Sequence, residues 1–560
     1  MTDRMQWAAT LMQALYMHGV RQIFISPGSR STPLTMAAAL HPHLTKTVVL
    51  DERSAAFMAL GAAKSTGLPA VLICTSGTAA ANYTPAVHEA RQSGVPMIIL
   101  SADRPPALRG IGSSQTIDQI KLFGDAAVFF HEAGEPDSSP DGLRRLRFAA
   151  RQAVEEAVSF GGAAHINLPF RKPLEPEPAD LAAIEKQYRE AGSSSVDSPF
   201  ASRTVHHEAV IERLNTSQKP LLIAGSANPF QQLSNDAHSL AEKLHAPLLA
   251  ECGSGCTTDG HSVSGWDLFL RDEKLAAQLE PDLIVRFGDQ PYTKSLLTRL
   301  AGWRHIPTIH ISARSAWQDM AMSSAVRTLL SPTDILNLET VQPVVDANWL
   351  AGWKEAEEKQ TIRRQSQLDE MPELCDPHIF AHLADAIPEN WITMLSNSLP
   401  VRDMATFGRS TPNQIVNRGA AGIDGIVSTA LGAGIARGLP VCCITGDLAF
   451  LHDSNALLEA KQLKHPFVMV VVNNGGGSIF RLLDIMEKSG GHFTRYFETP
   501  RSVQLHHLAA AHDIPYRRIE TKEELRSLDP KSFSAGPHII ECVTDPDKSM
   551  ALRNRCTTPL

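Results

Sequence analysis

The most informative part of this chain is residues 441–477, which begin VCCITGDL (441–448) and end FVMVVVNNGGG (467–477). Both runs are strongly apolar and both end in polar or glycine residues, as buried strands of a parallel sheet do. The intervening residues 449–466 are enough for one helix. The segment therefore predicts a strand–helix–strand unit whose strands end, at Gly446-Asp447 and at Asn473–Gly477, on the same edge of one sheet.

The same alternation of short β-branched runs and helical stretches recurs along the whole chain in three groups. The expected strands are Gln22–Ser26, Thr47–Leu50, Ala70–Cys74 and Met97–Leu100, then Pro220–Ala224, Pro247–Ala250, Leu283–Phe287 and Thr308–Ile311, then Trp391–Leu395, Val441–Thr445, Phe467–Val472 and His538–Cys542. We expect an α/β protein with three consecutive open parallel-sheet domains at residues 1–180, 200–340 and 372–560. The expected linkers are Pro169–Asp180, Ser193–Pro199 and Trp353–Glu370.

The composition limits the classes of function. Apolar residues make up 43% of the 560 residues, which is typical of a folded protein, and the net charge of −8 provides no cationic field for nucleic acid or anionic lipid. No apolar run approaches the ~20 residues of a membrane-spanning helix, and Met1–Gly19 lacks the apolar stretch of a signal peptide. Cys252 and Cys256 lack the further ligands of a zinc site, which favours buried thiols. We expect a cytoplasmic enzyme without a membrane span or a nucleic-acid partner.

The sheet edge at Asp447 has the residue types that Mg²⁺ prefers. The carboxylate of Asp447, the amide oxygen of Asn474 and a backbone carbonyl are hard oxygen ligands, and phosphate and water can complete the octahedron. Glycines 475–477 let the backbone approach a diphosphate and present N–H groups to it. Gly-Asp and Asn-Asn-Gly are also common turn sequences, so either one alone is open to that interpretation. A second glycine-rich run, residues 432–438, misses the dinucleotide-binding spacing and favours helix packing.

Charged residues follow several other predicted strands. Glu52 opens an alanine-rich helix, where it could be a catalytic carboxylate or only an acid favoured by the helix dipole. Arg30 and Arg104 follow strands of the first group, and Arg402 and Arg418 lie after strand ends of the third. Because a guanidinium binds carboxylates bidentately, this set points to an organic acid with several carboxylates.

Seven segments carry a resemblance to a known family. They are Pro27–Leu34, Asp51–Arg53, Thr75–Ala79, Ala102–Pro106, Ser396–Arg402, Asn417–Gly425 and Asn473–Phe480. In this order along the whole chain they resemble the 2-succinyl-5-enolpyruvyl-6-hydroxy-3-cyclohexene-1-carboxylate synthases of menaquinone biosynthesis. Gly-Asp and Asn-Asn at their spacing are similar to the thiamin-diphosphate motif of many decarboxylases and acetolactate synthases, with Leu448 in place of its last glycine. The arginine segments are not part of that general motif.

The resemblance implies a fold, a cofactor and a metal site. The three domains would be pyrimidine-binding, middle and diphosphate-binding domains, and the cofactor would be thiamin diphosphate with Mg²⁺ or Mn²⁺. Metal ligands would be Asp447, Asn474 and the carbonyl of Gly476, and catalytic residues would be Glu52, Arg402 and Arg418. Ile423 would keep the two rings of the cofactor bent, and Glu52 would activate the cofactor through its aminopyrimidine. The implied cofactor-binding residues are Glu52, Pro27, Ser76, Gly77, Ser398, Ile423, Asp447, Asn474, Gly476, Ser478 and Ile479.

The resemblance also implies the substrates and an assembly. The enzyme would be a transferase that decarboxylates 2-oxoglutarate and adds the four-carbon fragment to isochorismate, in a homodimer or homotetramer with active sites between subunits. The implied substrate-binding residues are Asn397, Ser398, Arg402 and Arg418 for the oxoacid, and Arg30, Arg104, Gln115 and Lys294 for isochorismate. The alternatives are another thiamin-diphosphate 2-oxoacid decarboxylase or acetohydroxyacid synthase, a non-catalytic ligand-binding protein and a dinucleotide-dependent oxidoreductase.

Overall fold

The computed structural model of this chain describes residues 1–191, 207–226, 230–258, 260–312, 319–320, 324–328, 341–342 and 344–558. The expected linker Ser193–Pro199 and the expected domain boundaries at residues 200 and 340 lie outside these residues. Within them, no helix has the length and apolar content needed to cross a membrane. All eight cysteines are buried, including Cys252 and Cys256, as expected.

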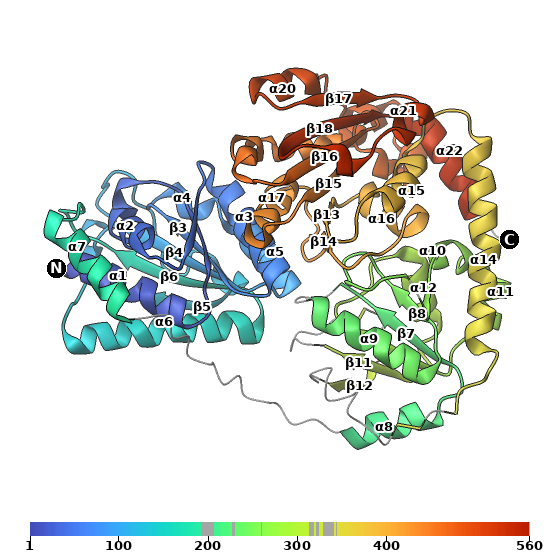
Figure 1. Ribbon diagram of the computed structural model, residues 1–560, viewed down its shortest axis with the longest axis horizontal. Coiled ribbons are helices and arrows are strands. Elements are labelled where there is room, and N and C mark those ends of the chain that lie inside the picture. Colours follow the sequence, from blue (N-terminus) through green and yellow to red (C-terminus); the bar gives the residue numbers. More distant parts are fainter. Residues whose placement is uncertain are drawn as a thin grey trace. The chain divides into compact units, whose positions relative to one another are not determined.

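The described residues form three six-stranded sheets, and every strand pair in them is parallel (Figure 1). This confirms the predicted α/β class with three open parallel sheets. Two compact units contain them: residues 1–201, 419–438 and 453–462 form the first, and residues 202–418, 439–452 and 463–560 form the second. Residues 419–438 and 453–462 follow the second sheet in sequence but cluster with the first sheet in space.

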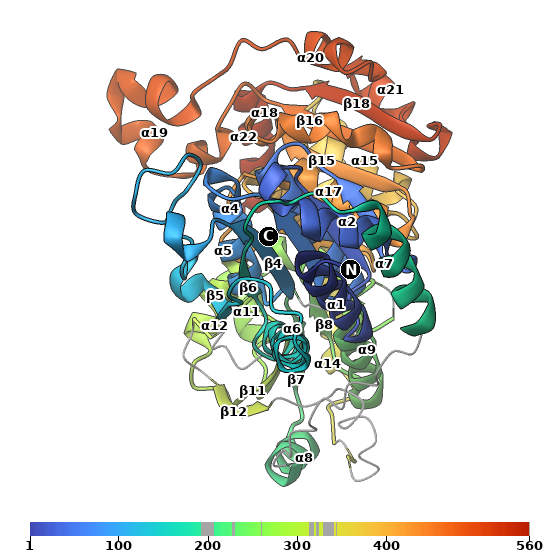
Figure 2. The ribbon, with the colours of Figure 1, turned by 90° about the vertical axis from the view of Figure 1, so that its left-hand side faces the viewer.

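The first sheet has the order β2-β1-β3-β4-β6-β5. Its strands are β1 (Gln22–Ile25), β2 (Thr45–Val48), β3 (Ala70–Cys74), β4 (Met97–Asp103), β5 (Ala127–Glu132) and β6 (Ala163–Pro169). Its helices are α1 (Asp3–Met17), α2 (Thr32–Leu40), α3 (Glu52–Thr66), α4 (Thr78–Ala81), α5 (Thr84–Ser93), α6 (Pro140–Phe160) and α7 (Pro178–Ala191). Successive side chains of each strand point to opposite faces of the sheet. On one face, Ile25 of β1, Ile73 of β3 and Leu100 of β4 are buried in a core with α1 and α6. These two helices pack on each other and lie together in Figure 2.

Helix α17 (Ile426–Arg437) belongs to the first unit because it packs closely on α3. A Cβ added to Gly61 would lie 2.0 Å from the carbonyl oxygen of Thr429, and one added to Gly432 would lie 2.0 Å from that of Met58. The two glycines therefore permit the backbones to approach. This confirms that the glycine-rich run 432–438 serves helix packing.

The second sheet has the order β12-β11-β10-β7-β8-β9. Its strands are β7 (Pro220–Ala224), β8 (Leu248–Ala250), β9 (Ser262–Val263), β10 (Leu283–Phe287), β11 (Thr308–Ile311) and β12 (Ser324–Thr328). The accompanying helices are α8 (His207–Thr216), α9 (Phe230–Leu244), α10 (Trp266–Phe269), α11 (Glu273–Gln278), α12 (Lys294–Gly302) and α14 (Trp349–Glu370). Helix α14 covers the expected linker Trp353–Glu370, and Trp349 and Trp353 on it are buried in the core of this sheet.

The third sheet has the order β14-β13-β15-β16-β18-β17. Its strands are β13 (Ile392–Leu395), β14 (Gln414–Val416), β15 (Val441–Gly446), β16 (Pro466–Asn473), β17 (Tyr516–Ile519) and β18 (Gly536–Val543). The helices in this part of the chain are α15 (Asp376–Ala386), α16 (Leu399–Phe407), α18 (Asp447–His452), α19 (Ile485–Lys488), α20 (Leu505–Ala511), α21 (Lys522–Arg526) and α22 (Pro546–Thr557). One face of the sheet is buried with α15, α16 and α22 through residues such as Ile444, Val470 and Ile540.

Strand order identifies where each sheet can bind a ligand. In open parallel sheets the ligand lies beyond the carboxyl ends of the two strands at which the order reverses. In the first sheet these are β1 and β3, which lead into Pro27 and Ser76, and in the third they are β13 and β15, which lead into Asn397 and Asp447. Four predicted site residues thus follow the strands that the topology singles out, while Arg104 and Asn474 follow the neighbouring strands β4 and β16.

Candidate functional site

Asp447 is the first residue of α18 and is buried, with 8% of its surface exposed. Burial raises the pKa of Asp447 to about 6, although hydrogen bonds from the backbone N–H groups of Leu448 and Gly476 lower it in part. A divalent cation bound here would offset that desolvation, because it favours the ionised carboxylate. The residue therefore fits the metal site predicted for it.

Asn474 follows β16 and is held by a buried aspartate. Its Nδ2 donates to Oδ2 of Asp376 at 2.9 Å, so the amide oxygen on the same planar group faces away from Asp376. Asp376 is fixed in turn by Arg553, with a hydrogen bond of 2.7 Å. The orientation of Asn474 is therefore set by the protein and leaves its oxygen available as a metal ligand.

The glycine run after Asn474 needs its glycines. Gly476 has a φ of +125°, and a Cβ there would lie 2.3 Å from the carbonyl oxygen of Glu498. The carbonyl of Gly476 accepts from the N–H of Ser478 at 2.8 Å and keeps a second lone pair for a cation. Ser478 is buried, and Ile479 follows it in the 3₁₀ segment Ser478–Leu482. The described residues contain no cluster of three His, Cys, Asp or Glu side chains suited to a metal. A metal here would therefore need carboxylate, amide and carbonyl oxygens from the protein together with phosphate oxygens.

Two arginines meet beyond the third sheet. Arg418 donates from Nη1 to Oδ1 of Asn397 at 3.0 Å, and Arg402 donates from Nη1 to the carbonyl of Ser398 at 2.5 Å. Burial lowers the pKa of Arg402, and the like charge of Arg418 lowers it further. The buried Nε of Arg418 has no hydrogen-bond partner among the described residues. A carboxylate would satisfy that donor and relieve the repulsion between the two cations.

The backbone supports this arginine pair. Ser398 has a φ of +72°, which is an uncommon conformation for a residue other than glycine, at the N-cap of α16. Nδ2 of Asn397 donates to the carbonyl of Asn417 at 2.7 Å and so joins the loops that carry the two arginines. Asn397, Ser398, Arg402 and Arg418 are thus brought together, as predicted for one binding site.

A second cluster of predicted residues lies at the carboxyl ends of the first sheet. Arg104 hydrogen-bonds the hydroxyl of Ser76, and Nε2 of Gln115 donates to the carbonyl of Ser76 at 3.1 Å. Gly77 has a φ of +85° and lies against Gln115. Arg30 is buried, and both its burial and the charge of Arg104 lower its pKa. Like Arg418, Arg30 has a buried Nε without a hydrogen-bond partner among the described residues.

Glu52, Pro27 and Ile423 complete the predicted residues of this unit. Glu52 is half-buried in the first turn of α3, whose N-cap Asp51 accepts the backbone N–H of Arg53 at 2.8 Å. Pro27 is exposed just after β1. Ile423 is 37% exposed and belongs to the same compact unit as Glu52 rather than to the unit that contains Asp447. An exposed isoleucine and a half-buried carboxylate are available to a ligand.

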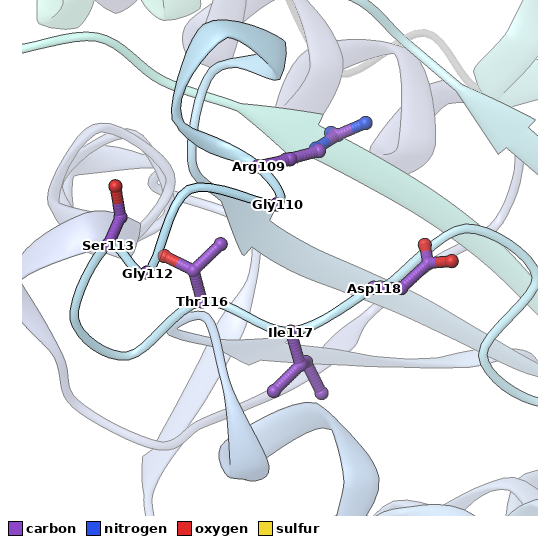
Figure 3. A pocket seen from close by; sticks show the side chains of 7 residues that line it. All are labelled: Arg109, Gly110, Gly112, Ser113, Thr116, Ile117 and Asp118. Carbon is purple, nitrogen blue, oxygen red and sulfur yellow. The ribbon is translucent and has the colours of Figure 1, made fainter.

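The loop that carries Gln115 also lines an open pocket. Figure 3 shows the seven residues around it, from Arg109 to Asp118. Arg109 is already paired with Asp103 at 2.7 Å and with Glu132 at 2.8 Å. None of the predicted site residues lines this pocket. Its one arginine is neutralised within the chain, so the pocket adds no anion site.

Buried polar residues that are not among the predicted ones hold these clusters in place. Gln119 accepts the backbone N–H of Gly77 at 2.9 Å, and Glu251 accepts the N–H groups of Tyr292 and Thr293 just before Lys294. Lys294 itself is exposed at the start of α12. A buried Gln or Glu has no distinctive pattern in a single sequence. Only the position of Glu251 directly after a predicted strand could have indicated it.

Comparisons with known proteins agree with this geometry. The model of the "Thiamine pyrophosphate enzyme, N-terminal TPP binding domain" matches residues 5–122, and that of the corresponding C-terminal TPP binding domain matches residues 401–542. Proteins named 2-succinyl-5-enolpyruvyl-6-hydroxy-3-cyclohexene-1-carboxylate synthase are similar over nearly the whole chain. The one from Chloroflexus aurantiacus is 37% identical over 99% of this chain and 96% of its own length, and the one from Haloarcula marismortui is 36% identical over 98% and 97%. The one from Bacillus velezensis is 35% identical over 94% and 92%. The chain therefore belongs to the family of 2-succinyl-5-enolpyruvyl-6-hydroxy-3-cyclohexene-1-carboxylate synthases, which are thiamin-diphosphate-dependent transferases of menaquinone biosynthesis.

Proposed function

We propose that this enzyme decarboxylates 2-oxoglutarate and adds the resulting four-carbon fragment to isochorismate. The observation that carries the proposal is the pair Arg402 and Arg418, because two adjacent cations, with a buried donor that has no partner among the described residues, suit a dicarboxylic oxoacid better than a small monocarboxylic one. The second arginine cluster, Arg30 with Arg104, suits a second organic acid. A decarboxylase that uses one small oxoacid has no need for both clusters.

Thiamin diphosphate, when bound, supplies the electron sink that lets a 2-oxoacid lose carbon dioxide and leaves a nucleophilic carbon. Asp447, Asn474 and the carbonyl of Gly476 would hold its Mg²⁺, or Mn²⁺, and Ser478 and Ile479 would lie along the diphosphate. Glu52 would hold a proton at a ring nitrogen of the aminopyrimidine, as general acid–base chemistry requires of a positioned carboxyl group. Pro27, Ser76 and Gly77 would line the pyrimidine, and Ile423 would pack against the rings.

The substrate groups have separate tasks. Arg402 and Arg418, with Asn397 and Ser398, would orient the carboxylates of the oxoacid and stabilise the charge that develops after decarboxylation. The isochorismate carboxylates would be bound by Arg30, Arg104, Gln115 and Lys294. Exclusion of water would keep the carbanionic carbon from being protonated before it adds to isochorismate.

The proposal extends to domains and assembly. Residues 1–180 would be the pyrimidine-binding domain, 200–340 the middle domain and 372–560 the diphosphate-binding domain. The enzyme would be a cytoplasmic homodimer or homotetramer whose active sites take Glu52 from one subunit and Asp447 from another.

The test is an assay of carbon dioxide release from 2-oxoglutarate with and without isochorismate, with mass spectrometry of the products. We expect a condensation product, in a one-to-one ratio with carbon dioxide, only when both acids are present. Release of carbon dioxide with succinic semialdehyde as the sole product in both cases would assign the chain to the simple decarboxylases instead.

A further inference from the structure

The second sheet contributes a fixed aromatic residue to the arginine pair. Tyr292 lies between β10 and α12, and the guanidinium carbon of Arg418 is 4.9 Å from the centroid of its ring. A cation at this distance over an aromatic face is attracted by the electrons of the ring. Tyr292 and Arg418 belong to the same compact unit. Arg418 is among the residues predicted from the sequence, but Tyr292 is not.

The backbone at Tyr292 is held by a buried carboxylate. Oε1 of Glu251 accepts the N–H groups of Tyr292 at 3.1 Å and Thr293 at 2.9 Å, and Oε2 accepts the hydroxyl of Thr293 at 2.7 Å. Glu251 has no exposed surface. Three hydrogen bonds to one buried carboxylate leave the segment little freedom to move.

The ring of Tyr292 is held at its far end as well. Its hydroxyl donates to the carbonyl of Cys252 at 3.0 Å, and the ring packs against the apolar core of the third sheet. The chain after Cys252 is itself confined, because a Cβ on Gly253 would lie 2.7 Å from Cγ2 of Val416 on β14. Val416 precedes Arg418 by two residues. The segment that binds the hydroxyl of Tyr292 and the strand that leads to Arg418 therefore pack tightly against each other.

Arg418 needs such support. Arg402 repels it, and Asn397 restrains only one edge of its guanidinium, through the 3.0 Å bond to Nη1. An arginine side chain loses considerable rotamer entropy when it is ordered. A flat ring against one face of the guanidinium orders the side chain in advance, so less entropy is lost when a ligand binds. The buried Nε of Arg418 has no hydrogen-bond partner among the described residues and is the donor that a carboxylate would satisfy.

We propose that Tyr292 is a positioning residue of the middle domain that holds the guanidinium of Arg418 ready for a carboxylate of the oxoacid, with Glu251 as its anchor. The inference rests on the proposed function in that it takes the ligand of Arg418 to be a dicarboxylic acid. It assigns the middle domain a part in oxoacid binding, whereas Lys294, the only residue of that domain predicted from the sequence, is assigned to isochorismate.

The first experiment measures binding of glutarate, an unreactive dicarboxylate of the same length as the oxoacid, to the Mg²⁺–thiamin-diphosphate enzyme by calorimetry. Tyr292→Phe keeps the ring and should change the Kd less than threefold. Tyr292→Leu removes the ring and should raise the Kd about tenfold, with a matching rise in the KM for 2-oxoglutarate and a smaller fall in kcat. Tyr496→Leu is the matched control, since Arg495 lies over that exposed ring at 5.3 Å, and it should leave the Kd unchanged.

The second experiment separates the electronic effect from a packing effect. Phenylalanine with one, two or three ring fluorines, incorporated at position 292, keeps the shape of the ring but weakens its attraction for cations. We expect the Kd for glutarate to rise with each fluorine while the midpoint of thermal unfolding stays constant. A Kd that does not change across the series, in an enzyme that binds glutarate, would overturn the role of Tyr292. Failure of the unsubstituted enzyme to bind glutarate would overturn the proposed oxoacid site, and this inference with it.

Discussion

Glu52 is the residue whose role separates an enzyme from a binding protein on the same scaffold. It is half-buried at the start of α3, in a different compact unit from Asp447 and the glycine run 475–477. Its expected contribution is to chemistry more than to cofactor affinity, because other residues would bind the metal and the diphosphate.

We therefore expect Glu52→Gln to reduce kcat by at least a hundredfold, in the range that general acid–base catalysis contributes, while Mg²⁺ and thiamin diphosphate still bind. Turnover is measured by product formation and binding by calorimetry. Glu280→Gln, at a partly exposed position, is the control and should retain full activity. Undiminished turnover in Glu52→Gln would refute the assigned role.

Several charged site residues could be predicted from the sequence, because a charged residue directly after a predicted parallel strand lies at the edge of the sheet where ligands bind. The structure brings Arg402 together with Arg418, and Arg30 together with Arg104. Tyr292 could not be predicted, since its importance comes from partners far away in sequence, and the position of Glu251 after a predicted strand does not reveal that it holds residues 292 and 293. A single sequence does not record which carbonyl or guanidinium a buried side chain meets.

Among the structural elements, the pair α3 and α17 depends on small residues in a way that can be measured. Gly432→Ala places a methyl group against the carbonyl of Met58, and we expect it to destabilise the protein by about 1–3 kcal/mol despite the better helix propensity of alanine. Gly352→Ala in α14 is the matched control, because its Cβ would meet only Leu279 at 3.8 Å, and it should be neutral or slightly stabilising. Denaturant unfolding followed by circular dichroism checks both. Equal effects would contradict the packing account.

Strand β6 carries a buried histidine that couples stability to pH. Burial lowers the pKa of His165 to about 3, and its Nε2 lies 2.7 Å from the hydroxyl of Ser101. Because the unfolded chain binds a proton at this residue below about pH 6.5 and the folded chain does not, stability is full above that pH and falls toward pH 3, by up to about 1.4 kcal/mol per pH unit. We expect His165→Gln to flatten this part of the stability profile.

The sequence predicts most strands with strongly apolar cores and misses short, alanine-rich or polar strands as well as β5, which reads AVFFHE. The expected strand Thr47–Leu50 was displaced, since β2 covers Thr45–Val48. The strands not predicted are β5, β6, β9, β12, β14 and β17. Strand β6 reads AAHINLP, so two alanines, His165 and Asn167, which have low β-propensity, interrupt its apolar pattern, and all seven residues are buried because the sheet is covered on both faces. In β17 the strand reads YRRI and lies at a sheet edge, where polar residues are tolerated.

At the scale of the whole molecule, the net charge of −8 hides a local concentration of positive charge. The arginines gather beyond the carboxyl ends of two sheets, where a confined field acts on a bound anion more strongly than the total charge does. Composition excluded nucleic acid from the expected partners but could not reveal this arrangement.

Sites formed between subunits would make two inactive chains complement each other. Mixed and reassembled Glu52→Gln and Asp447→Asn chains should recover about a quarter of the activity of the unsubstituted enzyme, because half of the dimers are mixed and each of these has one intact site. Steady-state product formation measures the recovery, with each variant reassembled alone as the control. No recovery from mixed dimers, verified by mass spectrometry, would contradict shared sites.

The most direct test of the account is a crystal structure of the enzyme grown with Mg²⁺ and thiamin diphosphate. We predict density for the diphosphate at the glycine run 475–477, with the metal bound by Asp447, Asn474 and the carbonyl of Gly476, and with Glu52 of one chain at the pyrimidine ring. Cofactor density elsewhere in the molecule, or a metal bound without these three oxygens, would contradict it.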